Sequence, residues 1–583
     1  MKSEKCFFAG FLFLILGFLS VSLTYAADIP SRDTGGAEQD RFEKNQKLEK
    51  RVRNIDEANP PKEVPLEDQQ KMTLPAEGSQ VHFLLKEVHI TGNETIARSE
   101  FDRVILGYVG QEVGFRELKE LGTKIKNIYR EKGFIAAYVY MPPQDVTSGR
   151  VEFAVAEGKL GKVNILGNKW FSTSILKRML RLSSGAVISY KDLKRGLAFL
   201  NENQDIKAKA VLKPGAEIKT SDLDIEVQDK MTAHITADVN NLGTANTGKN
   251  RWGISMVDTN FLGLMDQLST RFELGSRSWS LGTGYTIPLT SFGTSLGFNY
   301  SHSKVDVGGP FKDLQVEGRA NTYGIDLTQK VFRETVNDSV YVEGDLNIGF
   351  DFKSIENKVL GSKAGHDELR ILNTGVNLEE ADNFGKTYFP HSFHFGFSDF
   401  LGASGNIDSS SIRRGTGGQF FIYRGSLARY LRLPYDLVYA FRSSWQFTPD
   451  NLPSSEELRM GGAFSVRGYP EGDYLSDNGA YASNEIYIPT YFFPKNWKLP
   501  FSSEPLRRQI QGVTFIDFGG GTLRNTLAGE EKNKFLIGAG GGLRIHLFDR
   551  IYGRFQWAGR LGAQDASDNS SSAFYYGVSA EML

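Results

Sequence analysis

Arg467 and Asp517 are the residues whose types and settings most suggest a specific polar contact in this sequence. Arg467 lies in a glycine-rich stretch, residues 461–472, whose backbone can fold tightly. Asp517 alternates with Phe518 in a strand-like stretch, so its carboxylate can point to one face of a sheet. A loop that reached this face could place the guanidinium against the carboxylate in a bidentate contact. The alternative is a surface loop and an unrelated acidic residue.

Residues for enzymatic chemistry form no recognisable pattern. The eight histidines are scattered, and neither a His-Glu-x-x-His motif nor a phosphate-binding loop occurs in the sequence. The single cysteine, Cys6, lies in the predicted leader, so we expect no disulfide, cysteine-based metal site or cysteine nucleophile in the mature chain. We therefore predict no catalytic residue, no cofactor and no metal, and the protein is not expected to be an enzyme.

Charge and hydropathy argue against two further classes of protein. The 583 residues include 68 Lys and Arg against 69 Asp and Glu, a net charge of -1. A nucleic-acid-binding protein normally shows a basic excess, so no nucleic-acid partner is expected. The mean hydropathy of -0.32 is far below that of a helical membrane protein, so this class is excluded as well.

The first 26 residues have the three parts of a secretory signal peptide. Lys2 and Lys5 precede an apolar run, and Ala26 supplies a small residue at the expected cleavage site. The alternative, an uncleaved anchor, is disfavoured because Asp28 and Pro30 end the apolar run at once. The mature chain is therefore expected in the periplasm, in the medium, or in the outer membrane as strands.

Residues 231–583 show the two-residue alternation of β-strands. In residues 437–447, for example, Tyr439, Phe441 and Trp445 oppose Arg442 and Gln446. This alternation alone fits a soluble all-β protein as well as a membrane barrel. About 16 such segments, at roughly 22 residues per strand and connection, favour an outer-membrane barrel with a polar lumen. We therefore predict a mainly β fold with a 16-stranded transmembrane β-barrel at 231–583.

Two features are predicted before the repeats and the barrel. Residues 37–57 are mostly charged, with a narrow apolar stripe at Leu48, Val52 and Ile55. This pattern indicates a polar helix that suits water or a water-lined channel. Prolines between residues 60 and 75 then indicate an extended linker, so residues 27–79 are interpreted as a polar helix followed by a linker.

An internal repeat occupies residues 80–230. The sequence pattern of residues 88–93 recurs at residues 163–168. In the first copy, Leu118, Leu121 and Ile125 have the spacing of one helix face. Each copy is consistent with the order strand, helix, helix, strand, strand. We therefore predict two βααββ modules, at 80–157 and 158–230.

The loop and strand motifs resemble those of the outer-membrane assembly and translocation barrels that carry POTRA modules. The matching residues are Val466, Arg467, Gly468 and Tyr469 in the loop and Phe515, Asp517 and Gly519 in the strand. The polar helix, the linker, the two repeats and the barrel are more narrowly similar to the two-partner secretion transporter (TpsB) family, which includes haemolysin and filamentous-haemagglutinin secretors. Residues 260–266 are similar to the first-strand signature of that family.

This resemblance implies an outer-membrane pore of a Gram-negative cell, with its barrel in outer-membrane lipid and its POTRA modules in the periplasm. The modules would bind a large, β-helical secreted exoprotein (TpsA-like) while it is unfolded, by adding its chain to a sheet edge. The pore would secrete this partner without ATP, driven by its folding outside. The helix at 37–57 would plug the lumen, and Arg467 with Asp517 would anchor a loop inside it.

Two other functions remain as alternatives. An outer-membrane β-barrel protein insertase shares the loop motif, but insertases usually carry more repeats and lack a plug helix. A passive diffusion porin would not need the 80–230 region. A long secreted protein encoded beside this chain would favour secretion over both.

Overall fold

The computed structural model describes residues 66–68, 82–134, 137–157, 159–182, 190–214, 220–336, 339–500, 502, 504–526, 531–548, 550–562 and 564–582. The predicted signal peptide at 1–26 and the predicted plug helix at 37–57 lie outside the described residues. The predicted linker contributes one described segment, the short strand β1 (Leu66–Asp68).

The first module packs two helices on a small sheet. Its elements are β3 (Glu87–Thr91), α3 (Ser99–Ile105), α4 (Phe115–Glu131), β5 (Tyr138–Tyr140) and β6 (Arg150–Ala156), with the small pair β2 (Phe83–Leu84) and β4 (Glu112–Val113) beside them. The Glu117 side chain accepts a hydrogen bond from the Gly114 backbone N–H at 2.9 Å and thereby caps the start of α4. Leu118, Leu121 and Ile125 of α4 are buried against the sheet. The sheet order is β3-β6-β5.

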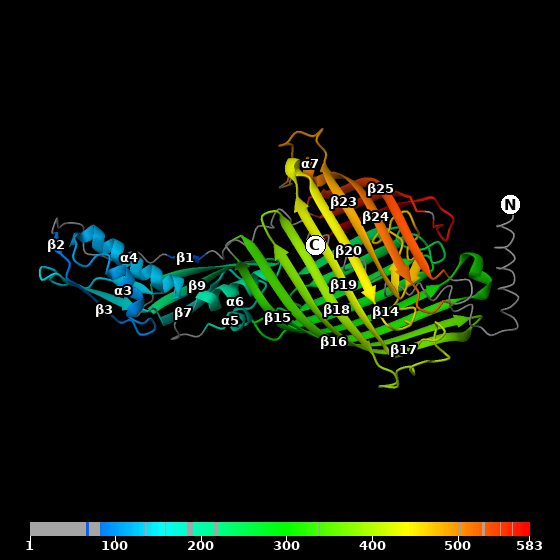
Figure 1. Ribbon diagram of the computed structural model, residues 1–583, viewed down its shortest axis with the longest axis horizontal. Coiled ribbons are helices and arrows are strands. Elements are labelled where there is room, and N and C mark those ends of the chain that lie inside the picture. Colours follow the sequence, from blue (N-terminus) through cyan, green and yellow to red (C-terminus); the bar gives the residue numbers. More distant parts are fainter. Residues whose placement is uncertain are drawn as a thin grey trace.

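The second module repeats this plan. It contains β7 (Lys159–Leu166), α5 (Thr173–Leu180), α6 (Tyr190–Glu202), β8 (Ile206–Pro214) and β9 (Thr220–Asp229). Its sheet has the order β1-β8-β9-β7, because β1 from the predicted linker pairs in parallel with β8. Both modules thus have the βααββ order predicted from the repeat, and they extend from one end of the barrel (Figure 1).

Within the described residues, sixteen antiparallel strands form a closed barrel, as the sequence predicts. The strands are β10 (Ala233–Asn240), β11 (Arg251–Asp258), β12 (Gln267–Gly275), β13 (Ser278–Pro288), β14 (Thr294–Asp306), β15 (Glu317–Val336), β16 (Val340–Val359), β17 (Ser362–Ala381), β18 (Gly385–Gly396), β19 (Phe420–Arg432), β20 (Val438–Phe447), β23 (Asn478–Pro489), β24 (Ile510–Thr522), β25 (Asn533–Leu547), β26 (Ile551–Arg560) and β27 (Ser572–Glu581). The barrel closes where β27 pairs with β10, with Val578 opposite Val239.

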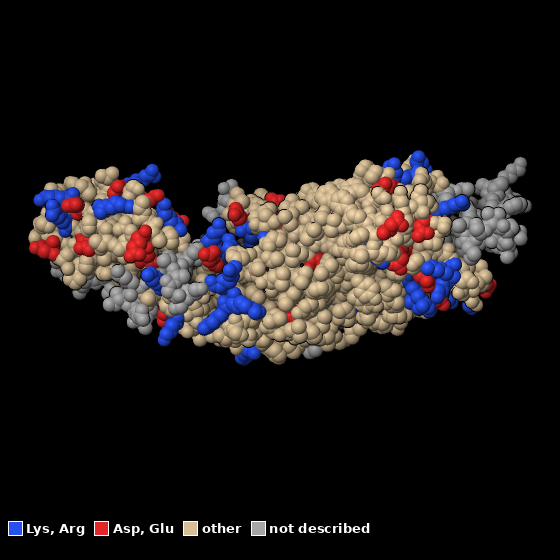
Figure 2. Space-filling model, turned by 90° about the horizontal axis from the view of Figure 1, so that it is seen from below, with Lys and Arg blue, Asp and Glu red and all other residues tan. Residues whose placement is uncertain are grey.

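The aromatic face of the strands points outward. Trp252 and Trp557 are 63% and 54% exposed, whereas Arg271 and Glu485 on the inward face are each 3% exposed. A soluble sheet would bury the aromatic face, so this arrangement distinguishes between the two possibilities that alternation alone leaves open. Figure 2 shows the consequence, a broad wall with few charged side chains and charges gathered toward its two ends. Among the described residues, no helix has both the length and the apolar character that a bilayer span requires.

Successive connections alternate between the two ends of the barrel. Residues 259–266 therefore lie at the end that carries the modules. Residues 397–419, 448–477, 523–526 and 531–532 lie at the opposite end. We call residues 448–477, between β20 and β23, the lumen loop. It contains the short strands β21 (Leu458–Met460) and β22 (Tyr474–Ser476).

Residues 260–266, singled out by the resemblance, form the turn between β11 and β12 and join the barrel to the second module. Met265 is buried in the hydrophobic core of that module. The Asn260 side chain donates a hydrogen bond to the Trp170 carbonyl at 3.2 Å. Beside them, the Thr259 hydroxyl donates to the Asp205 carboxylate at 2.6 Å. This turn therefore fixes the position of the second module against the barrel.

Candidate functional site

The lumen loop contacts the inner wall of the barrel through Arg467. Its Nε donates to Oδ2 of Asp517 on β24 at 2.7 Å, and its Nη2 donates to Oδ1 at 2.7 Å. The Arg467 backbone N–H adds a third hydrogen bond to the same carboxylate at 3.0 Å. Because the two residues are 1% and 0% exposed, the pair is shielded from water. We call Arg467 and Asp517 the lumen lock.

Two further strands contribute partners to the same guanidinium. Nη1 lies 2.6 Å from Oε1 of Glu485 on β23, and Nη2 donates to the Ser483 hydroxyl at 2.8 Å. Nη1 also donates to Oε1 of Gln556 on β26 at 3.3 Å. Glu485 in turn accepts a hydrogen bond from Arg442 of β20 at 2.5 Å. The two arginines therefore balance the two carboxylates, which limits the cost of burying these charges.

Each position of the strand motif has a separate role. Phe515, Asp517 and Gly519 are two residues apart, so all three point into the lumen. The guanidinium of Arg467 lies over the Phe515 ring, 3.4 Å from its centroid. A Cβ added at Gly519 would lie 2.6 Å from Cγ2 of Val466, so glycine provides the space for the loop. Phe515 therefore stacks on Arg467, Asp517 binds it, and Gly519 leaves room for the loop.

The loop backbone reaches the last strand through the residues after Arg467. Gly468 has a φ of +100°, and an added Cβ would lie 3.1 Å from backbone atoms of Gly559 and Arg560. Its N–H donates to the Tyr575 hydroxyl of β27 at 3.0 Å, and that hydroxyl donates to the Tyr469 carbonyl at 2.8 Å. The loop tip is thus held by strands on both sides of Asp517.

A second contact holds the loop nearer its beginning. Glu456 lies 2.7 Å from Lys353 of β16 and 3.2 Å from Arg424 of β19. Burial raises the pKa of Glu456, but the two cations outweigh this effect and lower it to about 2. Glu456 therefore stays ionised at neutral pH, and the loop contacts opposite parts of the wall.

The structure brings all seven residues of the predicted site together in one buried region. Val466 and Tyr469 are fully buried in the loop, and Phe515 and Gly519 flank Asp517 on the wall. Sequence reasoning missed Glu485, Gln556, Tyr575, Ser483 and Gly538. A Cβ at Gly538 on β25 would lie 1.7 Å from the Arg467 carbonyl. Gly538, Gly540 and Gly542 are two residues apart and face inward on β25. These glycines are the sequence feature that could have indicated room for a loop against this part of the wall.

Among the described residues, no group of three or more His, Cys, Asp or Glu could hold a metal ion. The buried polar groups around Arg467 donate to and accept from one another. The site therefore fastens the lumen loop to the barrel wall.

Comparison with known families gives two matches. A family model described as haemolysin secretion/activation protein ShlB/FhaC/HecB matches residues 219–545, more than half of the chain. A second model, described as a POTRA domain of the ShlB type, matches residues 83–158.

Known proteins and a solved structure are also similar to this chain. The heme/hemopexin transporter protein HuxB of Haemophilus influenzae is 23% identical over 422 residues, 70% of this chain and 73% of that protein. The outer membrane transporter CdiB of Dickeya dadantii is 23% identical over 432 residues, 72% of this chain and 73% of that protein. The structure of CdiB from Escherichia coli shares the fold, with a TM-score of 0.70 and 19% identity over 94% of this chain and 99% of that one. The chain belongs to the haemolysin secretion/activation protein ShlB/FhaC/HecB family.

Proposed function

We propose that this protein captures an unfolded exoprotein in the periplasm and passes it through its barrel to the cell surface. The barrel lies in the outer membrane, and the POTRA modules extend from its periplasmic end. The observation that carries the proposal is the lumen loop, which is fastened inside an otherwise polar channel by a buried ion pair. A pore that must stay closed between transport events needs such a removable obstruction.

The lumen lock sets how firmly this obstruction is held. Removal of one member of a buried ion pair costs about 3–5 kcal/mol, because the remaining charge is left buried without its partner. The plug helix predicted at 37–57 would add a second obstruction in the same lumen. With two obstructions, the resting channel is expected to conduct little, and the cargo would have to displace both.

Capture of the cargo is expected at a sheet edge of the first module. In the second module, β1 already pairs with β8. In the first module, β5 has the place that β8 has in the second. Within the described residues, β5 is an edge strand of its sheet. Tyr138 and Tyr140 of β5 stack with ring centroids 5.7 Å apart. An extended chain could add beside β5 through main-chain hydrogen bonds without a fixed sequence.

A cross-linking experiment tests this capture site. The sequence has one cysteine, Cys6, in the predicted signal peptide, so an introduced cysteine would be unique in the mature chain. Tyr138→Cys should cross-link to the exoprotein during secretion, whereas Lys119→Cys on the exposed face of α4 should not. Equal cross-linking at both positions would argue against β5 as the capture edge.

Export is proposed to need no ATP, because folding of the exoprotein outside would prevent its return. The relatives named above are transporters, and we extend this role, rather than an enzymatic one, to the present chain. The test is co-expression with a candidate long exoprotein. The exoprotein should appear in the culture supernatant and remain in the periplasm without the pore. Loss of other outer-membrane barrels on deletion would instead indicate an insertase.

A further inference from the structure

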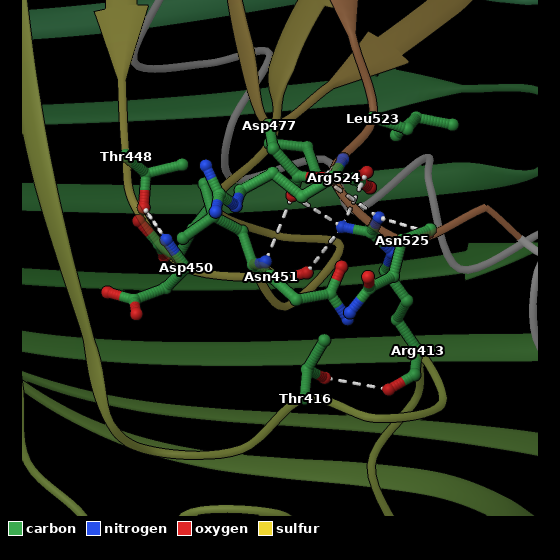
Figure 3. Close-up of polar contacts among 12 residues, drawn as sticks. Arg413, Thr416, Thr448, Asp450, Asn451, Asp477, Leu523, Arg524 and Asn525 are labelled. Atoms are coloured by element: carbon green, nitrogen blue, oxygen red, sulfur yellow. Dashed lines mark hydrogen bonds and ion pairs between the residues drawn. The ribbon is translucent and has the colours of Figure 1, made fainter. Parts of the chain in front are cut away.

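A second buried arginine lies at the external mouth of the barrel. Arg413, in the connection 397–419 between β18 and β19, donates from Nη1 to Oδ1 of Asp477 at 2.6 Å and from Nη2 to Oδ2 at 3.1 Å. The two side chains are 2% and 0% exposed. We call this pair the external clasp (Figure 3). It shares no residue with the lumen lock.

The external clasp joins three loops. Arg413 Nη1 also donates to the Leu452 carbonyl at 2.8 Å, and Asp477 accepts the Leu452 N–H at 2.9 Å. Leu452 lies near the beginning of the lumen loop, and Asp477 is its last residue. Asp477 further accepts the Arg524 N–H at 2.8 Å, and Arg413 donates to the Asn525 carbonyl at 3.3 Å. Both ends of the lumen loop and the residues just after β24 are therefore bound by Arg413 of 397–419 and its partner Asp477.

The connection 397–419 also lies against the opposite wall. Ile412 packs with Ala320 of β15 and Ile355 of β16, and it lies against the backbone of β17 at Gly365. Asp367 of β17 accepts a hydrogen bond from the Ser411 hydroxyl at 2.5 Å. Since 397–419 begins after β18, it must turn inward to reach β15. With the external clasp at its other side, it bridges the mouth from β15 to β24.

The chemistry of the external clasp suits an element that must open. Charge attraction is strong in a dry, low-dielectric site and weak in water. An exoprotein that enters the mouth brings water and its own peptide groups, which compete for the guanidinium and the carboxylate. An apolar contact of the same size would lack this sensitivity to hydration.

We propose that Arg413 is a positioning residue of the pore. With Asp477, it holds 397–419 across the external mouth and fixes both ends of the lumen loop until cargo arrives. The proposal rests on the secretion function proposed above. It goes beyond that function because it assigns closure of the mouth to a pair other than Arg467 and Asp517.

The chain provides a matched control at the next position. Arg414 is exposed, so Arg414→Ala removes the same charge from the same loop without touching the external clasp. The full-length protein would be studied in planar bilayers. Arg413→Ala should raise the fraction of time in open states by about tenfold, because the loop loses a buried charge pair. Arg414→Ala should leave it unchanged.

A labelling experiment measures the loop itself, without cargo. Ile412 is 3% exposed, so Ile412→Cys should react slowly with a membrane-impermeant maleimide on intact cells. Adding Arg413→Ala should make this labelling fast, adding Arg414→Ala should not, and Arg413→Lys should give an intermediate rate. If Arg413→Ala abolishes the heat-modifiable barrel, Asp477→Asn replaces it in both experiments.

Equal labelling rates and equal open-state fractions for the Arg413 and Arg414 variants would overturn the proposal. Failure of secretion as a function is distinguishable from this outcome, because neither measurement uses an exoprotein. If cargo never reaches the medium while Ile412→Cys labelling still depends on Arg413, the external clasp stands and the secretion function falls.

Discussion

The POTRA modules and the barrel use ion pairs in opposite ways. In the first module, Arg150 and Glu87 are 3.2 Å apart with side chains 78% and 56% exposed, and the core is apolar. In the barrel, Arg467 and Asp517 are buried, and the apolar side chains face outward. The modules are therefore held together by apolar burial, whereas the barrel uses buried charges to hold loops inside a polar lumen. Loss of an ion pair is expected to cost little stability in the module and much more in the barrel, because water reaches the module pair and not the barrel pair.

The largest expected effect comes from removing the buried arginine. Arg467→Ala should weaken the loop's attachment to the wall by about 3–5 kcal/mol. The loop should then lose its fixed place and lie in the path of the exoprotein, so release into the medium should be abolished. The barrel should still assemble, because backbone hydrogen bonds between strands are untouched. Heat-modifiability on gels checks assembly, and the supernatant is assayed for cargo. Arg150→Ala is the matched exposed control, and normal secretion by both variants would contradict the contrast drawn here.

A cavity in a module core should have the next largest effect. Leu121 of α4 is fully buried, so Leu121→Ala should destabilise the first module by about 2–5 kcal/mol. Hydrogen exchange measured on the full-length protein should speed up across α4 and β6 and stay unchanged in the barrel strands. Faster exchange in the barrel as well would mean that the two regions unfold together.

A smaller effect is expected where the lumen loop meets the wall. Gly519→Ala places a Cβ 2.6 Å from Val466, which should displace the loop at a cost of about 1–3 kcal/mol. Single-channel recordings should show more frequent openings than in the unaltered protein. Gly520→Ala on the outward face of the same strand is the control and should behave normally.

The smallest effect is expected for a second exposed pair in the modules. Lys132 and Glu100 are 2.7 Å apart with side chains 40% and 48% exposed. Glu100→Gln should change stability by at most about 1 kcal/mol, because water already solvates both groups. Thermal unfolding and secretion should match the unaltered protein. A loss as large as that of Arg467→Ala would remove the distinction between exposed and buried pairs.

Local patterns made much of this architecture predictable. The repeat at 88–93 and 163–168 indicated two βααββ modules, and alternation such as that of residues 437–447 indicated strands. The loop and strand motifs singled out Arg467 and Asp517. Neither pattern could identify Glu485 or Gln556 as partners, because their nearness depends on which strands are neighbours around a closed barrel.

The sequence by itself determined the strands, the modules and the two faces of the barrel wall, because alternation and helical spacing act over a few residues. The alternation fits a soluble sheet as well, so the membrane barrel was predicted from the number of segments, and the tertiary structure confirms that the aromatic face points outward. Only the tertiary structure brought Arg413 to Asp477 and β1 to β8, pairs far apart in the chain. Such contacts arise when barrel closure and loop folding place distant segments together, and no short stretch of sequence encodes that placement.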